Sequence, residues 1–541
     1  MLAMTAAAVV TFAFAAPAWA VARSWIGAGA GGAGTDFNTG TNWNPNGIPT
    51  SADDLTMTIT ATAYVTLSAD ITVGSLTISL SGNAKAFELD AQTYIFTING
   101  ATSANITSGN NSQIYIDVGN SPGRINYNGN VTAGAASANS FAAPICTYSG
   151  QTTGTVTFRA DLTFNASGGT CANTYKPATV IFDGTGTQTV TDNDNNWMKY
   201  FGYSSTLIGS ANTPTAVWAG TTTGGTQISG DLTVNANSTL DLTTKTLNRS
   251  AAGGTLALNA GAAMKLAAGS GGQTGSNFPS NFTTFTLNAA STVEYNGTVA
   301  QTVFATPTYG NLTVANNSTK TAGNALTVAG NVLINPTATF DVSASNFALS
   351  VGGNWTNDGT FNARSGTATF NATAAKTIGG SQDTTFFNLT HTTSGDIKFG
   401  DATTGGRTFT IAGTFNWSGS NLIIGNSAAP ALSDTLALPG SLTIPATFAL
   451  TMYNSSTLKL KGDWTNSGTF NAGTGTVEFN GSGTDLSPQT INGSLTTFYR
   501  VVVSNNSTVK LNVDANFQSE LVPTAGQFYL PATTSSWINV P

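Results

Sequence analysis

Two stretches of the chain are nearly the same. Residues 353–367 read GNWTNDGTFNARSGT and residues 462–476 read GDWTNSGTFNAGTGT, so eleven of the fifteen positions are identical. Each stretch runs into a second element, GTATFNATAAKTI at 366–378 and GTVEFNGSGTDLSPQTI at 475–491. Related copies of this second element occur at 178–190 and 291–303. Self-similarity on this scale is typical of repeat architectures, in which each copy packs on its neighbours.

A shorter period lies inside the long one, because Gly330 recurs as Gly353 and Gly440 recurs as Gly462. Within such a period, short runs that alternate apolar and polar residues are separated by Asn-Gly, Gly-Asn and Gly-Thr turns. We therefore predict an all-β chain that forms a right-handed parallel β-helix (a β-solenoid) of about 22–23 residues per coil, with alternate side chains pointing into a stacked core. The repeated Trp355 and Trp464 are expected at equivalent positions around their coils.

A β-sandwich or barrel is the alternative fold, because it also has many short strands with regular turns. Two features favour the solenoid. The repeat unit is one turn long and leaves no room for a hairpin return. Only 8% of the residues are charged, and low charge suits parallel coils in which like residues stack about 4.8 Å apart.

Composition excludes two further classes. The chain has 18 Lys and Arg against 25 Asp and Glu, a net charge of −7, and no basic cluster. Nucleic-acid binding needs such clusters to neutralise phosphates, so we expect no nucleic-acid partner. Disorder is disfavoured because 40% of the residues are hydrophobic, 9% are aromatic, and the apolar residues alternate in short runs.

The chain divides into three predicted segments. Residues 1–20 read as a signal peptide that ends in the small-x-small site Ala18-Trp19-Ala20, with a buried or truncated segment as the alternative. Residues 21–60 are predicted to cap the solenoid, with an irregular leader as the alternative. Residues 61–541 hold the repeats, either complete or truncated at the C-terminus, and no later stretch is apolar enough for a transmembrane span.

The chain has two cysteines, Cys146 and Cys171. Their spacing is close to one predicted coil, so in an exported chain we predict that they lie on adjacent coils and form a disulfide. Two unpaired buried thiols are the alternative.

The opening motifs, together with the repeats, resemble those of a known group. Trp25-Ile26-Gly27, Asn42-Trp43, Gly47-Ile48-Pro49 and Asp53-Asp54 precede the repeats W-T-N-x-G-T-F-N and G-T-V-x-F-N-G. This pattern is similar to that of bacterial surface parallel β-helix proteins, the autotransporter-passenger-like and filamentous-haemagglutinin-like repeat proteins, over nearly all of residues 21–541. The resemblance implies a β-helix fold and an extracellular or cell-surface location, but no single activity.

Candidate catalytic residues are few. The single His391 has no nucleophile or metal-ligand cluster spaced around it, and we interpret it as an ordinary surface or groove histidine. The densest charged patch is Asp396, Lys398, Asp401 and Arg407, which we interpret as charges gathered on loops.

The glutamates indicate the same conclusion. Glu294 and Glu478 share one place in the T-V-E-[YF]-N-G element, where other copies carry Ile181 or Thr369. A position that accepts such different residues behaves as scaffold. The sequence thus predicts no catalytic, cofactor-binding or metal site and no cofactor.

Our main functional hypothesis is a non-enzymatic exported surface or extracellular-matrix protein. The elongated scaffold would have an adhesion role or contact glycans or other cell-surface components. The first alternative is a secreted β-helix polysaccharide-degrading enzyme, a lyase or a glycosidase, which three convergent carboxylates would favour. The second is an ice-binding solenoid, indicated by Thr-x-Thr stretches at 56–60 and 187–189.

Overall fold

The computed structural model describes residues 20–118, 123–136, 140–143, 154–165, 178–193, 205–221, 226–228, 230–249, 251–269, 275–403, 405–428, 432–529 and 538–539. The chain forms two compact units, residues 1–180 and 181–541. Cys146, Cys171 and residues 1–19 of the expected signal peptide lie outside the described residues.

Both units are parallel β-helices. Among the described strand pairs, all run parallel except β1 (Ala22–Trp25) with β2 (Trp43–Asn44). The described residues contain no α-helix and a single 3-10 turn, η1 (Gly40–Asn42). In that part of the chain, no helix is long and apolar enough to cross a membrane. The prediction of an all-β parallel β-helix is confirmed.

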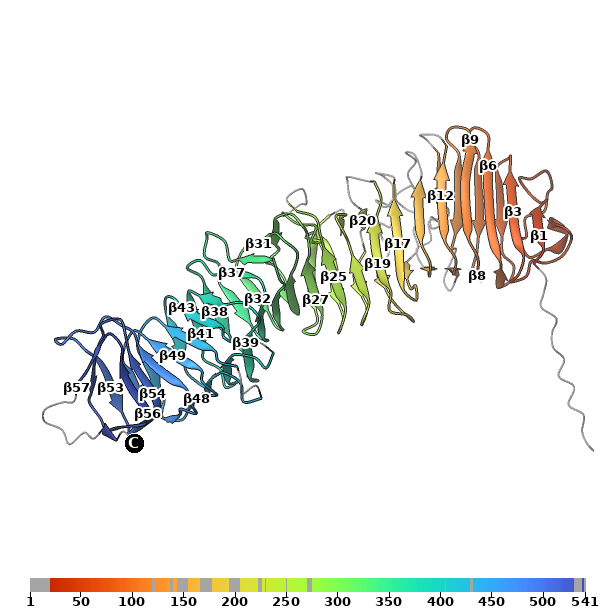
Figure 1. Ribbon diagram of the computed structural model, residues 1–541. Helices are drawn as coiled ribbons and strands as arrows, with labels where there is room; N and C mark the ends of the chain where they lie inside the picture. The colour runs from red at the N-terminus through yellow and green to blue at the C-terminus, as the bar shows by residue number, and fades with distance from the viewer. Residues whose placement is uncertain are drawn as a thin grey trace, which may run out of the picture. The chain divides into compact units, whose positions relative to one another are not determined.

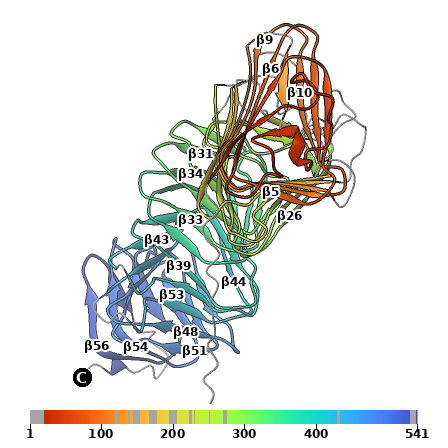
Figure 2. The ribbon, with the colours of Figure 1, turned by 90° about the vertical axis from the view of Figure 1, so that its right-hand side faces the viewer.

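The first unit has three faces, each built by one strand from every coil (Figures 1 and 2). The first face contains β3 (Asp54–Ile59), β6 (Ser75–Ser81), β9 (Thr102–Ser108), β12 (Val131–Ala135) and β15 (Leu162–Asn165). The second contains β4 (Ala63–Thr66), β7 (Ala86–Asp90), β10 (Gln113–Asp117) and β13 (Phe141–Ala143). The third contains β5 (Ile71–Val73), β8 (Ile95–Ile98), β11 (Arg124–Tyr127) and β14 (Thr155–Phe158). β16 (Thr179–Phe182) spans the boundary between the units.

The longest face of the second unit is a continuous parallel sheet. Its strands are β17 (Thr187–Asp192), β19 (Thr215–Ala219), β22 (Thr239–Asp241), β25 (Ala263–Leu266), β27 (Thr292–Tyr295), β30 (Asn311–Val314), β33 (Val332–Ile334), β36 (Trp355–Asn357), β39 (Lys376–Gly379), β42 (Ile397–Phe399), β45 (Leu422–Ile424), β48 (Ala449–Met452) and β51 (Thr469–Asn471).

Shorter sheets form the rest of the second unit. One group contains β20 (Thr226–Ile228), β23 (Leu247–Arg249), β28 (Gln301–Val303), β31 (Thr319–Ala322), β34 (Thr339–Asp341), β37 (Thr360–Asn362), β40 (Thr384–Phe386), β43 (Thr408–Ile411), β46 (Thr435–Leu438), β49 (Thr457–Leu460), β52 (Thr476–Phe479), β54 (Thr496–Val503), β56 (Ala515–Pro523) and β58 (Ile538–Asn539). The other contains β18 (Ser205–Ile208), β21 (Leu232–Val234), β24 (Gly253–Leu258), β26 (Phe282–Leu287), β29 (Thr308–Tyr309), β32 (Leu326–Val328), β35 (Leu349–Val351), β38 (Thr367–Phe370), β41 (Asn388–His391), β44 (Phe415–Trp417), β47 (Leu442–Ile444), β50 (Trp464–Asn466), β53 (Gln489–Gly493), β55 (Thr508–Leu511) and β57 (Gln527–Tyr529).

The coil length varies more than the repeats indicated. Val332 pairs with Trp355, which is the predicted spacing. Elsewhere the spacing differs, because Leu55 pairs with Leu76 over a shorter coil and Val131 pairs with Leu162 over a much longer one. The coils are therefore less regular than the predicted length of about 22–23 residues. Turns between the strands absorb the extra residues without changing which side chains point inward, because strand side chains alternate with a period of two.

The repeated W-T-N-x-G-T-F-N motif builds a buried aromatic corner. In the first copy, the ring of Trp355 contacts Phe361 edge-on, with centroids 4.6 Å apart, and lies 5.3 Å from Phe386. The side chain of Asn357 donates to the hydroxyl of Thr384 at 3.1 Å and accepts from the amide of Gly359 at 3.2 Å. The motif thus combines two large buried rings with an asparagine that satisfies the buried turn between them.

The second copy has the same contacts on a different face. Trp464 lies 4.8 Å from Phe470 and 5.2 Å from Phe498, and Asn466 donates to Thr496 at 3.1 Å. In the first copy, however, the tryptophan strand β36 lies in the long sheet, between β33 and β39. In the second copy the Thr-Phe-Asn strand β51 lies there, paired with β48. The local surroundings of the two tryptophans match, but the expected equivalent position around the coil is wrong by one strand.

Asparagine stacks link successive coils at one turn. The side-chain oxygen of Asn311 accepts from the amide of Asn331 at 2.9 Å, and that of Asn331 accepts from the amide of Asn354 at 2.7 Å. Asn354 in turn accepts from the amide of Thr377 at 3.0 Å. In-register stacking therefore lets each amide cap the next coil, which a charged side chain would not do without repulsion.

Residues 21–60 place an aromatic cluster beside the first coils. Trp25 and Trp43 are buried, with ring centroids 5.1 Å apart, and Phe37 lies 5.0 Å from Trp43. Phe37 also meets Phe96 of β8 at 5.3 Å, so the cluster reaches the coil core. The guanidinium of Arg23 forms an ion pair with Asp53 at 2.7 Å.

Candidate functional site

The outer face of the sheet formed by β4, β7 and β10 carries an unusual set of side chains. Tyr64, Glu88 and Tyr115 are direct partners on the three strands and form one outward row. Two residues along, Asp90 and Asp117 are direct partners in the next row. The inward positions between them are buried hydrophobic residues, as the alternation of a strand requires.

Three carboxylates in these two rows are buried. Glu88 is 5% exposed, Asp90 is 3% exposed and Asp117 is fully buried. Among the described residues, neither Glu88 nor Asp90 forms an ion pair with a lysine or arginine. Burial of carboxylates so close together disfavours their charged form, both through desolvation and through mutual repulsion.

The hydrogen-bond partners of Asp90 differ from those of Glu88. Tyr64 donates its hydroxyl to Asp90 at 2.5 Å, and the amide of Gln92 donates to the same carboxylate at 2.7 Å. The side chain of Gln92 bridges Asp90 and the hydroxyl of Tyr64. Three donors therefore converge on the carboxylate of Asp90. Glu88 instead shares a hydrogen bond with Asp117, and its buried Oε1 has no hydrogen-bond partner.

The pKa values follow from this environment. Burial raises the pKa of Glu88 to about 9, and the nearby charges of Asp117 and Asp90 add to the effect. Glu88 is therefore protonated at neutral pH and can donate its proton to Asp117. Burial, followed by the hydrogen bond to Asp90, also raises the pKa of Tyr64.

A small hollow opens beside Glu88. It has a volume of about 230 Å³ and is lined by Thr62, Ala63, Tyr64, Ala86, Glu88 and Tyr115. Ala86 lies two residues before Glu88 on the same strand, β7, and has the smallest side chain in the lining together with Ala63. Tyr115 holds its hydroxyl on Gln113 at 2.7 Å.

Sequence reasoning missed this site. The step from Tyr64 to Glu88 and the step from Glu88 to Tyr115 are both longer than the predicted coil, and they differ from each other. A constant coil length would therefore place these three side chains out of register. The signal that could have found them is the matching alternation in AYVT, AFELD and QIYID at 63–66, 86–90 and 113–117.

The structure brings the predicted charged patch only partly together, and of its four residues Arg407 alone is buried. Arg407 is 3% exposed, and its guanidinium binds Asp434 at 3.0 Å and Asp401 at 2.7 Å. Asp396 is not part of this network and accepts from the amide of Asn421 at 3.1 Å. The interpretation of the patch as loop charges holds for Asp396, Asp401 and Arg407 and is wrong for Lys398, which lies on β42. Arg407 lies in a loop but is buried, and the two carboxylates compensate its burial.

The neighbouring ionisable groups are shifted by the same burial. Desolvation raises the pKa of Asp434, although Arg407 opposes that rise. Burial lowers the pKa of Lys398, and the charges of Asp401 and Asp434 partly offset the effect. Arg407 thus joins Asp401 and Asp434 through its guanidinium, and we call this cluster the internal clamp.

His391 is fully buried, so its interpretation as a surface or groove histidine is wrong. Its Nδ1 lies 2.9 Å from the carbonyl oxygen of Phe370. Its Nε2 lies 2.5 Å from the carbonyl oxygen of Gly395 and 2.8 Å from the hydroxyl of Ser420. Both ring nitrogens are thus engaged inside the coil.

Glu294 and Glu478 have matching surroundings. Glu294 on β27 is the direct partner of Lys265, with a charged-atom separation of 3.9 Å. Glu478 on β52 is the direct partner of Lys459, at 3.1 Å. Each pair links neighbouring coils across the outer face and is partly exposed.

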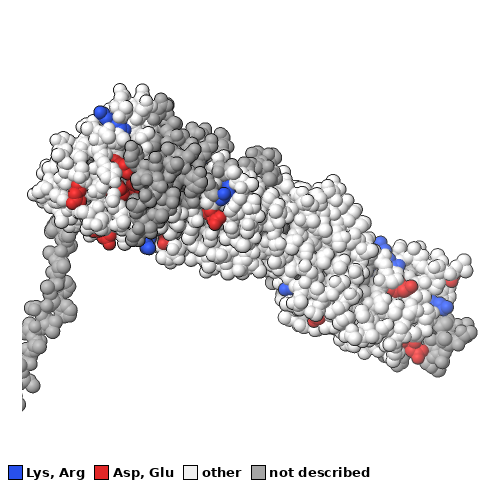
Figure 3. Space-filling view, turned by 180° about the vertical axis from the view of Figure 1, so that it is seen from behind, with Lys and Arg blue, Asp and Glu red and all other residues white. Residues whose placement is uncertain are grey.

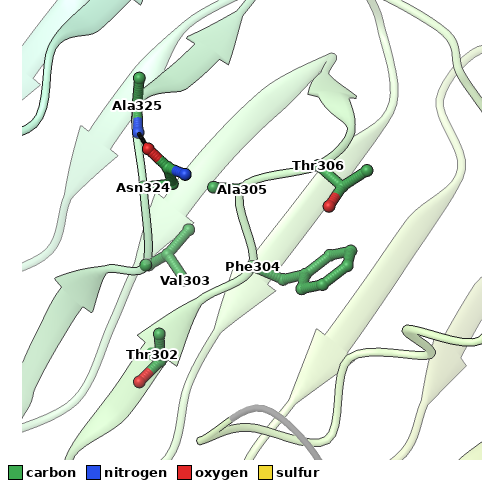
Figure 4. Close-up of a pocket in the computed structure, with 8 residues that line it drawn as sticks. Thr302, Val303, Phe304, Ala305, Thr306, Asn324 and Ala325 are labelled. Atoms are coloured by element: carbon green, nitrogen blue, oxygen red, sulfur yellow. Dashed lines mark hydrogen bonds between the residues drawn. The ribbon is translucent and has the colours of Figure 1, made fainter.

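A second, larger hollow lies in the second unit, beside β28 and the turns that follow β28 and β31 (Figure 4). Its volume is about 570 Å³ and its lining holds no charged residue. The ring of Phe304 and the hydroxyl of Thr306 lie along one segment, and Asn324 accepts from the amide of Ala325 at 2.8 Å on the next. The lining combines an aromatic ring with hydroxyl and amide groups.

A column of threonines runs along the outer face of the second unit. Four successive strands place threonine at the same position: Thr408, Thr435, Thr457 and Thr476. The adjacent outward column is mixed: Thr410, Ala437, Lys459 and Glu478. Charged side chains in this second column prevent a flat double array of threonines there.

Fold and surface together define the class: a parallel β-helix protein with largely uncharged outer faces (Figure 3). Comparison of the chain with protein-family models, curated proteins and solved structures finds no match. Within the described residues, no group of three His, Cys, Asp or Glu side chains is arranged to hold a metal ion.

Proposed function

We propose that this protein is a non-enzymatic exported scaffold of the cell surface or extracellular matrix that contacts glycans. The observation that carries the proposal is the register of uncharged polar groups on the outer faces, such as the threonine column. The resemblance of its motifs to those of bacterial surface β-helix proteins supports the same location and adhesin-like role.

Many weak hydrogen bonds can act together on such a surface. Hydroxyl and amide groups make hydrogen bonds of modest net strength, about 0.5–1.5 kcal/mol each. Parallel coils repeat such a group about every 4.8 Å, so a polymer lying along the sheet meets many of them at once. Linked weak contacts raise the overall affinity well above that of one contact. A glycan chain, which is also rich in hydroxyls, suits such a surface.

The polysaccharide-degrading enzyme is the second candidate, because the three buried carboxylates are the feature that would favour it. A protonated Glu88 suits a general acid. The base is the weak point, since Asp90 is held by Tyr64 and Gln92 and the Asp117 carboxylate is hydrogen-bonded to Glu88. The geometry therefore supports binding better than catalysis.

The test uses the purified full-length chain on an array of plant, bacterial and animal polysaccharides. We expect binding to at least one class and no release of shortened products. The double variant Thr435→Val and Thr457→Val removes two hydroxyls at nearly constant shape and should weaken the binding. Thr58→Val, at an exposed position of β3, is the matched control. Absence of binding to any polysaccharide contradicts the proposal, and turnover favours the enzyme.

A further inference from the structure

The hollow beside Glu88 has an unusual electrostatic character. It adjoins three buried carboxylates, and among the described residues neither Glu88 nor Asp90 has a cationic partner. Protonation of Glu88 removes one charge, which leaves the carboxylate of Asp90, without a cationic partner among the described residues, to make the potential negative. A low-dielectric surrounding strengthens that potential compared with water.

An acceptor without a partner lies beside the hollow. Glu88 lines it, is 5% exposed, and has a buried Oε1 without a hydrogen-bond partner. An unpaired buried oxygen is costly unless a ligand or water supplies a donor. When Glu88 donates its proton to Asp117, the remaining Oε1 can only accept. A ligand at this point therefore needs a hydrogen-bond donor, and a positively charged donor most of all.

Two tyrosines flank this acceptor. Tyr64 and Tyr115 are the direct partners of Glu88 on either side, and Tyr64 is 44% exposed. Aromatic faces attract cations and also pack on the apolar faces of small rings. The hydroxyl of Thr62 completes the rim.

We propose that the hollow lined by Tyr64, Ala86, Glu88 and Tyr115 binds the ammonium group and ring of a protonated amino sugar. The proposal rests on the proposed glycan-contact function and names its ligand class. The volume of about 230 Å³ lies below the ~300–1,000 Å³ of drug-sized sites, as expected for one sugar residue.

An amino sugar fits better than a lysine side chain. Its ammonium is attracted to Glu88 Oε1 and to the carboxylate of Asp90, and its ring packs on the exposed ring of Tyr64. Its remaining hydroxyls meet the polar rim at Thr62, for which a lysine stem has no counterpart.

The test is a calorimetric titration of the full-length protein with a glucosamine oligosaccharide and with its N-acetylated counterpart. N-acetylation removes the positive charge and keeps the ring, so we expect binding to weaken roughly tenfold or more. Ala86→Leu places a larger side chain in the lining of the hollow without changing any charge and should also weaken binding of the glucosamine oligosaccharide roughly tenfold or more. Ala257→Leu, at an outward alanine on β24 that belongs neither to the hollow nor to the threonine column, is the matched control.

Several outcomes overturn the inference. Equal affinity for the two oligosaccharides excludes an ammonium site in this hollow. The same follows if the Ala86→Leu variant binds the glucosamine oligosaccharide as tightly as the parent protein. Competition by oligolysine at equal affinity shows a general attraction for cations and overturns the assignment to an amino sugar. Thermal melting checks that Ala86→Leu is folded, and Ala86→Val replaces it if it is not. If neutral glycans bind but Ala86→Leu leaves binding of the glucosamine oligosaccharide unchanged, this inference alone is overturned, whereas failure of all glycans to bind also overturns the proposed function.

Discussion

Trp464 packs edge-on against Phe470 with ring centroids 4.8 Å apart, as Trp355 packs against Phe361 at 4.6 Å. Both tryptophans are fully buried. Each ring also meets a phenylalanine from the following coil, so the corner joins contacts within a coil to contacts between coils. The repeat thus preserves a packing unit, and its tryptophan is the largest part of that unit.

We expect Trp355→Ala and Trp464→Ala to lower the free energy of unfolding by about 3–5 kcal/mol each, because each removes a large ring and leaves a cavity. Trp355→Phe and Trp464→Phe should cost less, since part of the ring contact remains. Hydrogen exchange with mass spectrometry can locate the loosened coils, which suits a repeat protein whose unfolding need not be two-state. Equal protection in the Ala and Phe variants would show that the corner contributes little.

Glu88 predicts an unusual dependence of stability on pH. Its pKa is raised from the ordinary value of 4.5 to about 9 in the folded chain, so the folded state holds a proton that the unfolded state has lost. The stability contributed by this site is fully present below about pH 4.5 and decreases as the pH rises to about 9. Urea unfolding at a series of pH values measures the effect.

Glu88→Gln is the matched variant, because an amide has the shape and the donor of the protonated acid. We expect it to match the parent chain near pH 5 and to be more stable than the parent at pH 9. The same difference between the two proteins at pH 5 and pH 9 would refute the raised pKa.

Arg407 is expected to be essential to local stability. Arg407→Met would leave Asp434 buried without its cation, which costs about 3–5 kcal/mol when one partner of a buried pair is removed. Adding Asp434→Asn should recover part of the loss, since the stranded charge disappears. Chemical unfolding of the single and double variants measures both effects, and a single variant as stable as the parent would contradict the clamp.

The pair Lys459–Glu478 should contribute much less. Lys459 is 37% exposed at its side chain, and exposed pairs are worth about 0–1 kcal/mol. A double-mutant cycle with Lys459→Ala and Glu478→Ala should give a coupling in this range that shrinks at high salt. A coupling above about 2 kcal/mol, or one insensitive to salt, would mean that the pair is more than a surface contact.

The parallel β-helix could be predicted because residues such as Gly353, Trp355 and Gly462 recur in the sequence at the long repeat and at the coil length. Strand alternation with a period of two is local, so it survives any change in turn length. The period around the coil is not local. It depends on how many residues each turn holds, and the coils from Leu76 to Leu162 are longer than the repeats indicated.

This explains why the candidate site was missed. Glu88, Asp90 and Asp117 meet only through the register of β7 with β10, which a fixed coil length does not reproduce. His391 was misjudged for a related reason, because the carbonyl of Phe370 and the hydroxyl of Ser420 that satisfy it come from neighbouring coils. Long-range partners of this kind leave no pattern around the residue itself.

The second aromatic corner is displaced by one strand relative to the first, so the outer residues of the two copies point in different directions. Each copy carries its own packing, but the turns between the copies decide which way its outer residues face. Two copies of one sequence therefore present the same chemical groups in different directions around the coil axis. Under the proposed function, the two copies would offer glycan contacts on different sides of the coil instead of along one line, and one molecule would bridge two separate glycan chains.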